Sequence, residues 1–393
     1  MSHWTRHAAV IAGLAGLACA ALAACSNDPK PVPPAGGGGG GDPHTAVVTI
    51  TAAGGCQADR DSYGSGGLTF RITNKDATGV SEVELLAGER IVGEKENIPP
   101  GFSGTFALSV EPGTYTLYCP GAKTPRTTLH VTGTATSTGN TDTSALLAQG
   151  TKDYGVYVSR QVGLLVEAVK PLAAVLRKGD LAAAQVAYAK ARPFYERIEP
   201  VAESFTSGTV ALDPAIDARE GDVPAAKWTG FHRIEKGLFQ AKRTAGLASF
   251  GDRLLADSVK LAGLVNGLTY QPAELANGAV ELLDEVSKSK ITGEEERYSH
   301  IDLLDVQANV EGSEQAFANL EPALAKIDPA LAKTVSSTFD GVDAMLDKYR
   351  SASQPSGFLL YNGLAKPDVT ALAHAVQAIA EPLSRVASKV VNG

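Results

Sequence analysis

The chain has 393 residues, and its 35 Lys and Arg against 43 Asp and Glu give a formal net charge of −8. This acidity disfavours nucleic acid and anionic lipid headgroups as partners, because both bind basic surfaces, whereas it suits a cationic ligand. The length exceeds one typical hydrophobic core, so we expect more than one domain.

Residues 1–24 have the features of an export signal. Arg6 precedes an apolar run over residues 8–24 that is too short and too rich in Ala and Gly for a membrane span. The run ends in Leu-Ala-Ala-Cys, which resembles the lipobox of bacterial lipoproteins, so we expect cleavage before Cys25 and acylation of its thiol. The alternative is an ordinary signal peptide that happens to contain Cys25. Cleavage leaves 34 Lys and Arg against 43 Asp and Glu, a net charge of −9.

Residues 25–43 contain several prolines and then six consecutive glycines, a composition that predicts a flexible tether. A lipid anchor followed by a tether would hold the folded part at an outer membrane surface. We therefore expect an extracytoplasmic, lipid-anchored protein whose contact with the bilayer is made through acylated Cys25.

Residues 44–134 predict a small β domain. Short segments of alternating polarity, bounded by Gly, Pro and Asn, are typical of a sandwich. They lie at residues 46–51, 68–73, 82–86, 104–109, 115–118 and 127–131. A second linker rich in Thr, Ser, Gly and Asn follows at residues 135–142.

Residues 143–393 predict an all-α domain. The segment is rich in Ala and Leu with helical periodicity, and Asp180 and Asp328 stand where helix N-caps are expected. Pro224 is expected to begin the helix that carries His232. We expect eight or nine helices joined by short loops, enough for two packed bundles.

Two cysteines, Cys56 and Cys119, remain in the predicted β domain, 63 residues apart. In an oxidising compartment they are expected to form a disulfide. Alternatively, they hold a copper or iron ion with a strand carboxylate, Glu82 or Glu84, because Cys119 ends a strand as the copper thiolate of cupredoxins does. Neither His nor Met stands between Cys119 and Thr127, which disfavours a blue-copper site. Both alternatives stay open.

The helical part contains two pairs of potential metal ligands at helical spacing. His232 and Glu235 are three residues apart, as are Glu196 and Glu199, and such neighbours share one face of a helix. Facing helices of bundles build metal sites from such pairs. An acidic turn with Asp213 and the segment of residues 293–300 are expected to line the same cleft.

The set of ligands favours iron or manganese over zinc. Inverted zinc peptidases use His-x-x-Glu-His, but position 236 is Lys, so the motif supplies one imidazole. Carboxylate oxygens are hard ligands. A zinc peptidase that uses His232 and Glu235 stays an alternative, as does a metal-dependent binding module for acidic polysaccharide. A haem-binding module is disfavoured, since only 2 Met and 7 His are present in the whole sequence.

Four segments carry a family resemblance. They are residues 96–103, 195–200 (Tyr-Glu-Arg-Ile-Glu-Pro), 230–236 (Gly-Phe-His-Arg-Ile-Glu-Lys) and 297–312, which begins with Arg-Tyr-Ser-His and ends with Gln-Ala-Asn-Val-Glu-Gly. In these segments and their order the chain resembles the EfeO family of periplasmic iron-uptake proteins over nearly its whole mature length. The resemblance implies a cupredoxin-like domain followed by an imelysin-type helical domain of two four-helix bundles with a cleft between them.

The resemblance also implies function and residue roles. It implies a binding protein that captures iron, as Fe²⁺ or Fe³⁺, and delivers it to a membrane permease of a system that includes a haem peroxidase. In the β domain an ion, with copper as an alternative to iron, would assist a change of iron oxidation state. By position, the implied metal ligands are Glu196, Glu199, Asp213, His232 and Glu235 in the helical domain and Cys56, Glu82 and Cys119 in the β domain, with Glu295 lining the cleft as a substrate-binding residue.

Overall fold

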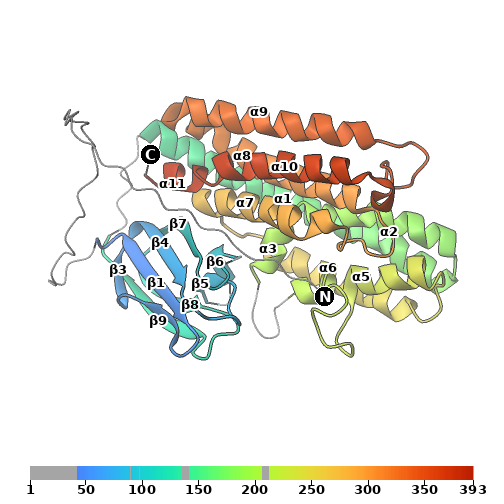
Figure 1. Cartoon of the computed structure of the whole chain (residues 1–393), viewed down its shortest axis with the longest axis horizontal. Coiled ribbons are helices and arrows are strands. Elements are labelled where there is room, and N and C mark those ends of the chain that lie inside the picture. Colours follow the sequence, from blue (N-terminus) through green and yellow to red (C-terminus); the bar gives the residue numbers. More distant parts are fainter. Residues whose placement is uncertain (1–41, 89, 97, 135–140, 206–211, 393) are drawn as a thin grey trace, which may run out of the picture. The chain divides into compact units, whose positions relative to one another are not determined.

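The computed structural model describes residues 42–88, 90–96, 98–134, 141–205 and 212–392. The predicted signal peptide, Cys25 and all but the last two residues of the predicted tether lie outside these ranges. The strands come first in the chain and the helices follow from Thr141 onward, as the sequence predicts (Figure 1). The expected domain limits themselves stay predictions.

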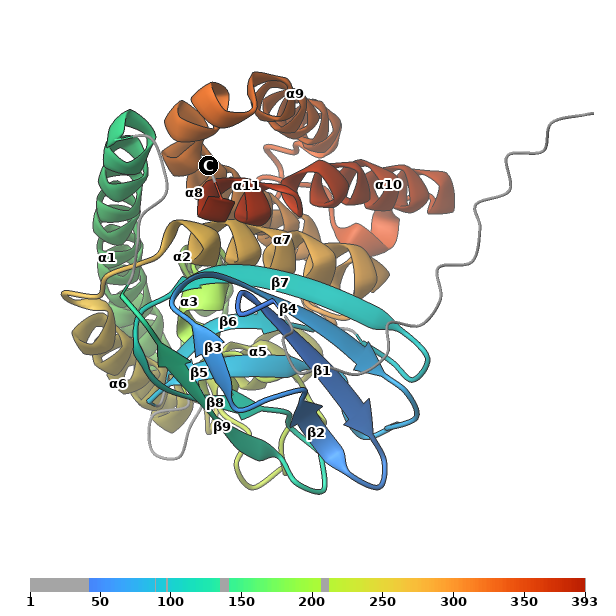
Figure 2. The ribbon, with the colours of Figure 1, turned by 90° about the vertical axis from the view of Figure 1, so that its left-hand side faces the viewer.

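Nine strands of the β region form two sheets. The four-stranded sheet has the order β2-β1-β4-β7 and the five-stranded sheet the order β3-β9-β8-β5-β6 (Figure 2). The six predicted strands are present, and the sequence analysis missed β2, β3 and β6. The strands are β1 (Thr45–Thr51), β2 (Gly55–Ala58), β3 (Ser62–Gly64), β4 (Gly66–Asn74), β5 (Val83–Ala87), β6 (Arg90–Lys95), β7 (Ser103–Val110), β8 (Gly113–Tyr118) and β9 (Arg126–Thr132).

Alternation along each strand builds the core of the β region. In β4, Leu68, Phe70 and Ile72 are buried, because side chains two residues apart share one face of a strand. The ring of Phe70 stacks on Phe106 of the neighbouring strand β7, with 4.6 Å between the ring centroids. Leu117 of β8, in the other sheet, belongs to the same buried cluster, so the two sheets share one core.

A disulfide joins Cys56 of β2 to Cys119, which follows β8. It therefore links the two sheets, and both cysteines are buried. The structure thus contains the first of the two arrangements that the sequence left open. A metal site made from Cys56, Glu82 and Cys119 requires free thiolates and stays a prediction for the reduced protein.

The β5–β6 hairpin carries a group of glutamates, and the two cations of β6, Arg90 and Lys95, form ion pairs with Glu274 and Asp284 of α7 (Pro272–Lys288). Glu84 lies opposite Glu94 in the strand register, and Glu82 and Glu96 flank the pair. Glu84 is 4% exposed and its Oε2 has no hydrogen-bond partner among the described residues. Burial, followed by the charge of Glu82, raises the pKa of Glu84 to about 8, and burial with the charge of Glu96 raises that of Glu82 to about 7.

Replacing Glu84 with Gln is expected to stabilise the protein at alkaline pH only. The pKa is raised in the folded state, so the native carboxyl loses stability as pH rises from its ordinary value of 4.5 towards about 8, whereas Gln does not titrate. We expect Glu84→Gln to gain about 1 kcal/mol or more in unfolding free energy at about pH 8.5 and little at about pH 5. Urea denaturation in the presence of a chelator measures the unfolding free energy of both proteins at the two pH values. The exposed Glu111→Gln is the control, and an equal gain at both pH values would contradict the explanation.

Eleven α-helices follow in the described part of the chain, and eight of them have seven or more residues. The three short ones, α3, α4 and α5, lie together in sequence and carry candidate site residues. The helices are α1 (Thr141–Lys178), α2 (Leu181–Glu196), α3 (Glu199–Glu203), α4 (Asp213–Ile216), α5 (Gly230–Glu235), α6 (Ala248–Val265), α7 (Pro272–Lys288), α8 (Asp302–Ile327), α9 (Pro329–Leu346), α10 (Lys366–Leu383) and α11 (Val386–Asn392).

The long helices pack on one another along their lengths. Helix α1 contacts α2, α6 and α8, while α10 contacts α7 and α9 (Figures 1 and 2). The predicted caps are present: Asp180 accepts a hydrogen bond from Ala183 N–H and Asp328 one from Leu331 N–H, each at 3.0 Å. The prediction for Pro224 is wrong, because the helix that carries His232 begins at Gly230. No described helix has the length and apolarity to cross a membrane.

The β region contacts α7 directly. Arg90 of β6 forms an ion pair with Glu274, and Lys95 Nζ lies 3.3 Å from Asp284 Oδ2. Asn277 Nδ2 donates to the carbonyl oxygen of Ala107 at 3.1 Å. Helix α7 therefore links the β sheets to the helices that carry the candidate site.

Candidate metal centre

The position of His232 is set by a close contact between the backbone at Gly230 and the backbone at Ile216. Gly230 begins α5 with φ +82°, and a Cβ there would lie 2.0 Å from the carbonyl oxygen of Ile216, so only glycine fits. Thr229 Oγ1 also donates to Ala215 O, and Trp228 Nε1 to Ala218 O, both at 2.7 Å. These contacts fasten the turn of residues 213–218 to the start of α5.

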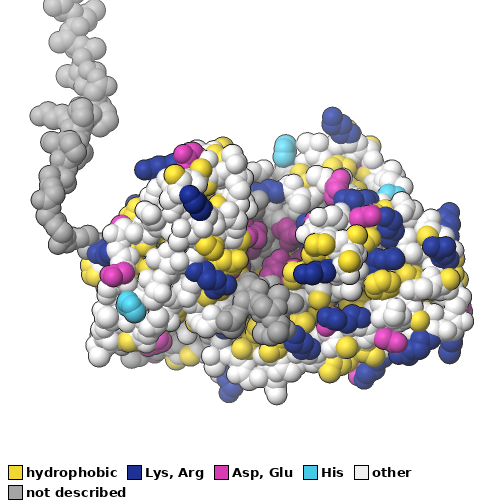
Figure 3. All heavy atoms as spheres, turned by 90° about the horizontal axis from the view of Figure 1, so that it is seen from below, with side chains coloured by type: hydrophobic (Ala, Val, Ile, Leu, Met, Phe, Trp, Pro, Cys, Tyr) yellow, Lys and Arg dark blue, Asp and Glu magenta, His cyan; other side chains and the backbone are white. Residues whose placement is uncertain are grey.

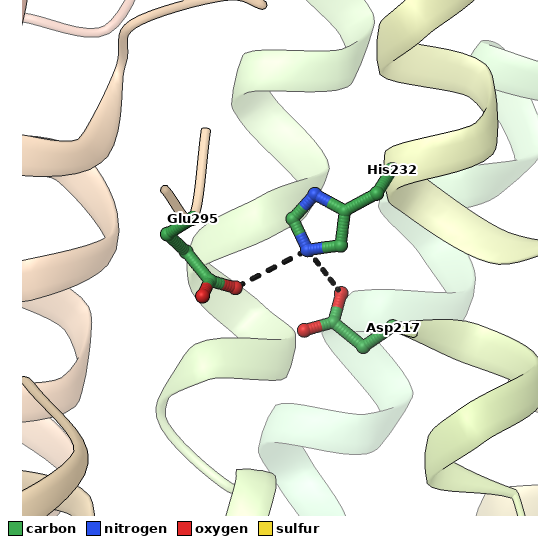
Figure 4. A group of neighbouring side chains, drawn as sticks. All are labelled: Asp217, His232 and Glu295. Carbon is green, nitrogen blue, oxygen red and sulfur yellow. Dashed lines mark hydrogen bonds and ion pairs between the residues drawn. The ribbon is translucent and has the colours of Figure 1, made fainter. Parts of the chain in front are cut away.

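His232 therefore lies beside two carboxylates from distant segments. Its Nε2 is 3.2 Å from Glu295 Oε1 and 3.5 Å from Asp217 Oδ1 (Figure 4). All three side chains are buried, and their ligand atoms lie within 4.8 Å of one another, the separation expected of groups that share one cation. We call these three residues the inner group.

The surroundings of His232 favour its protonated form. Its Nδ1 also faces a carboxylate, Glu235 Oε2 at 3.5 Å. Burial alone would lower the pKa of His232, but the charge of Asp217 and hydrogen bonds to Asp217, Glu235 and Glu295 raise it well above the ordinary value. A metal ion would have to replace the proton on Nε2.

Glu235 acts in the structure as a positioning residue. Its Oε1 accepts hydrogen bonds from the backbone N–H groups of Tyr298 and Ser299, both at 2.7 Å. One carboxylate thus fixes the segment of residues 293–300 and orients the imidazole. Glu235 belongs to none of the candidate ligand groups among the described residues, so its predicted role as a ligand stays a prediction.

Glu235→Ala is expected to destabilise the metal-free protein by about 2 kcal/mol or more, because it leaves buried N–H donors without an acceptor. Glu235→Gln keeps one acceptor oxygen and should cost clearly less. Denaturant unfolding in chelator gives both values. Equal losses in the two variants would show that the N–H contacts contribute little.

Arg192 of α2 is the central cation of the site. It is fully buried and forms ion pairs with five carboxylates. The guanidinium lies over the ring of Phe231, the residue before His232, with 5.1 Å to the centroid. The five partners are Glu196, Asp217, Glu295, Glu296 and Asp305. The nitrogen–oxygen distance is 3.2 Å to Glu295, 3.1 Å to Glu296 and 3.2 Å to Asp305.

Glu196 and Glu199 converge, although not on one helix. Helix α2 ends at Glu196 and α3 begins at Glu199, so the expected shared helical face is interrupted. The two carboxylates are brought together by Lys290 instead, whose Nζ lies 2.9 Å from Glu196 Oε2 and 2.5 Å from Glu199 Oε2. Lys290 is fully buried.

Besides the inner group, three sets of carboxylates among the described residues have oxygens close enough to share a cation: Glu196 with Glu295 and Asp305, Glu196 with Glu199 and Asp217, and Glu199 with Glu203 and Glu285. Glu199, Glu203 and Glu285 have oxygens within 4.8 Å of one another, and Glu203 and Glu285 are partly exposed. We call these three residues the outer group. Burial raises the pKa of Glu285 to about 7, although the Lys290 charge opposes this. Asp and Glu side chains also gather in a hollow of the surface (Figure 3).

Asp213 belongs to neither the inner nor the outer group. It accepts a hydrogen bond from the Tyr195 hydroxyl, and burial with the charge of Asp217 raises the pKa of Asp213 to about 6. It belongs to none of the candidate ligand groups among the described residues. Its predicted role as a ligand stays a prediction.

The arrangement suits a cation. Burying unbalanced charge is costly, and here buried carboxylates outnumber buried cationic groups. Asp305 Oδ1 and the side-chain amide oxygen Oδ1 of Asn309, both fully buried, have no hydrogen-bond partner among the described residues. Oxygens with a single imidazole form a hard ligand set that fits iron or manganese better than zinc. Three buried cationic groups, Arg192, Lys290 and His232, and the partly exposed Arg219, which pairs with Glu295, accompany eight buried carboxylates: Glu196, Glu199, Asp217, Glu235, Glu295, Glu296, Asp302 and Asp305.

Comparison with known proteins identifies the family. Residues 150–386 match the model of the imelysin family, Peptidase_M75. The chain belongs to the imelysin family. It is 39% identical over 337 residues to the iron uptake system component EfeO of Escherichia coli O157:H7, covering 84% of this chain and 88% of the relative. With EfeO of Yersinia pestis it shares 38% identity over 327 residues, 82% of this chain and 85% of the relative.

These matches confirm the resemblance to EfeO proteins, and the imelysin-family segment contains every residue of the inner and outer groups.

Sequence analysis selected His232, Glu295 and Glu199 of these groups. It noticed the acidic turn but not that Asp217 would face His232, and it missed Glu203 and Glu285. Arg192, Lys290 and Asp305 were also missed, because isolated charged residues on helices are usually on solvated faces.

Proposed function

We propose that this imelysin-family protein is the extracytoplasmic iron-binding component of an iron uptake system, which captures iron and delivers it to a membrane permease. The observation that carries the proposal is the buried inner group, Asp217, His232 and Glu295, within a surplus of carboxylates. The names of the EfeO relatives agree with this cargo. Anchoring through acylated Cys25 and a haem peroxidase as a further partner belong to the same proposal.

The residues of the inner group would capture an iron ion because their carboxylates are negatively charged and their oxygens are hard ligands. An iron ion would take the imidazole Nε2 of His232 and oxygens of Asp217 and Glu295, and its charge would offset carboxylates that are otherwise too close together. Arg192 keeps these carboxylates assembled while no ion is bound. Binding then needs little rearrangement of the backbone, which suits a carrier that must bind and release.

Peptide hydrolysis is less well supported. A hydrolytic zinc site uses three protein ligands, in most cases two or more of them His, and an open water position. The side chain that follows the His-x-x-Glu motif is Lys236, and its ammonium forms an ion pair with Glu220. His232 is the sole imidazole in the candidate groups of the described residues.

A redox role of the β domain, with iron or copper bound by Cys56, Glu82 and Cys119, remains part of the proposal for the reduced protein. Its test is the double variant Cys56→Ala, Cys119→Ala, assayed with a free-thiol count of the wild type. Unaltered iron uptake and oxidation in that variant would count against the role.

His232→Ala and Glu295→Gln are expected to weaken iron binding at least about tenfold, because each removes one ligand of a small set. Anaerobic loading with Fe²⁺, followed by elemental analysis and titration calorimetry, measures the effect. His374→Ala, which removes an exposed imidazole on α10, is the matched control. Equal iron in wild type and His232→Ala would refute the assignment of this site.

Cargo binding is expected to release about one proton from His232 near pH 7, because the raised pKa keeps the imidazole charged and coordination needs it neutral. Affinity should therefore fall as pH is lowered. Calorimetry in buffers of different ionisation enthalpy counts the protons. His232→Gln should release about one fewer, and identical counts would contradict this part of the mechanism.

A further inference from the structure

Lys290 contacts two members of the outer group and also Glu196. It begins a short 3-10 helix, Lys290–Thr292, just after α7 and before the segment that carries Glu295. Its Nζ contacts Glu196 on the side of the inner group and Glu199 and Glu285 of the outer group, with 3.6 Å to Glu285 Oε2. The ammonium thus marks a position that the surrounding carboxylates make favourable for a cation.

Arg192 and Lys290, two of the buried cationic groups of the centre, differ in how firmly they are held. The planar guanidinium of Arg192 is fixed by ion pairs to five carboxylates and by the ring of Phe231. Lys290 presents a compact ammonium on a flexible stem to three carboxylates, without a fixed donor geometry. Of the two, Lys290 is the cation that a metal ion can displace at lower cost.

We propose that Lys290 is a resident counter-cation, whose ammonium neutralises the carboxylates while no cargo is bound and is displaced when the cargo cation enters. This inference rests on the proposed function and adds how the site is regulated. Glu285 is partly exposed and within 3.6 Å of the ammonium, so Lys290 keeps an ion pair when it moves away from Glu196 and Glu199.

Displacement makes binding an exchange of one cation for another. Oxygens of Glu196 and Glu199 lie within 4.8 Å of an oxygen of Asp217, so a cargo ion bound to Asp217 also attracts these two carboxylates. Part of that attraction offsets the loss of their ion pairs with Lys290, so the net affinity is lower than the bare carboxylates would give. During release the ammonium returns to the same oxygens and replaces the departing ion. A buried charge is then never left without a partner, and delivery to a second protein becomes easier.

The test compares Lys290→Met with wild type in the full-length protein. Met has a similar length without the charge, so the variant should bind Mn²⁺, used as a redox-stable probe, at least about tenfold more tightly, which corresponds to about 1.4 kcal/mol. Release to a chelator should slow by a similar factor. The control is Lys170→Met, which removes the same charge from an exposed side chain that pairs with Glu167. It should leave affinity unchanged.

The outcomes separate this inference from the proposed function. Wild type that binds neither Fe²⁺ nor Mn²⁺ refutes the proposed function itself. Wild type that binds Mn²⁺, with Lys290→Met binding no more tightly, overturns only the role of Lys290. If the metal-free variant does not fold, Mn²⁺ should restore the fold by replacing the ammonium, and failure to fold in saturating Mn²⁺ also overturns the inference.

Discussion

The Arg192 guanidinium is fully buried and forms ion pairs with five carboxylates from α2, the turn of residues 213–218, the segment of residues 293–300 and α8. Without it these carboxylates would face one another in a medium of low polarity, and leaving a buried charge unpaired typically costs about 3–5 kcal/mol. The short, irregular segments of the site depend on this ion-pair network, since they contain too few residues to be stable by helix formation alone.

The same network leaves the centre short of positive charge. Arg192 and Lys290 neutralise part of the buried carboxylates, and His232 contributes a third charge only while it keeps its proton. Burial raises the pKa of Glu199, Glu296 and Asp305 well above the ordinary value, so protons supply part of the balance while no metal ion is bound. This need for protons or metal ions explains why a carrier of cations would use this arrangement. It also explains why the ligands come from loops and helix ends, where the backbone can bring side chains from several directions.

Much of the architecture was predictable. Alternating residues such as Leu68, Phe70 and Ile72 predicted strands, and the cap at Asp180 predicted the start of α2, because these signals are local. The helix with His232 was placed too early, because Pro224 is followed by a turn and Gly230 is the residue that permits the contact with Ile216. The His232–Glu235 pair was found by its spacing, but the backbone contacts of Glu235 could not be, since Tyr298 and Ser299 are distant in sequence.

By itself the sequence determined the order of β and α regions and the acidic balance, which follow from periodicity and composition, and it indicated the family through its resemblance to EfeO proteins in segments such as residues 230–236. Tertiary structure alone decided that Asp217 and Glu295 meet at His232, that Glu235 accepts hydrogen bonds from the backbone of Tyr298 and Ser299, and that Lys290 lies among Glu196, Glu199 and Glu285. The physical reason is that the sequence does not show whether a carboxylate or an ammonium group is solvated or buried. Packing removes the surrounding water, and the interaction of a charged group with its ion-pair partner becomes strong only then.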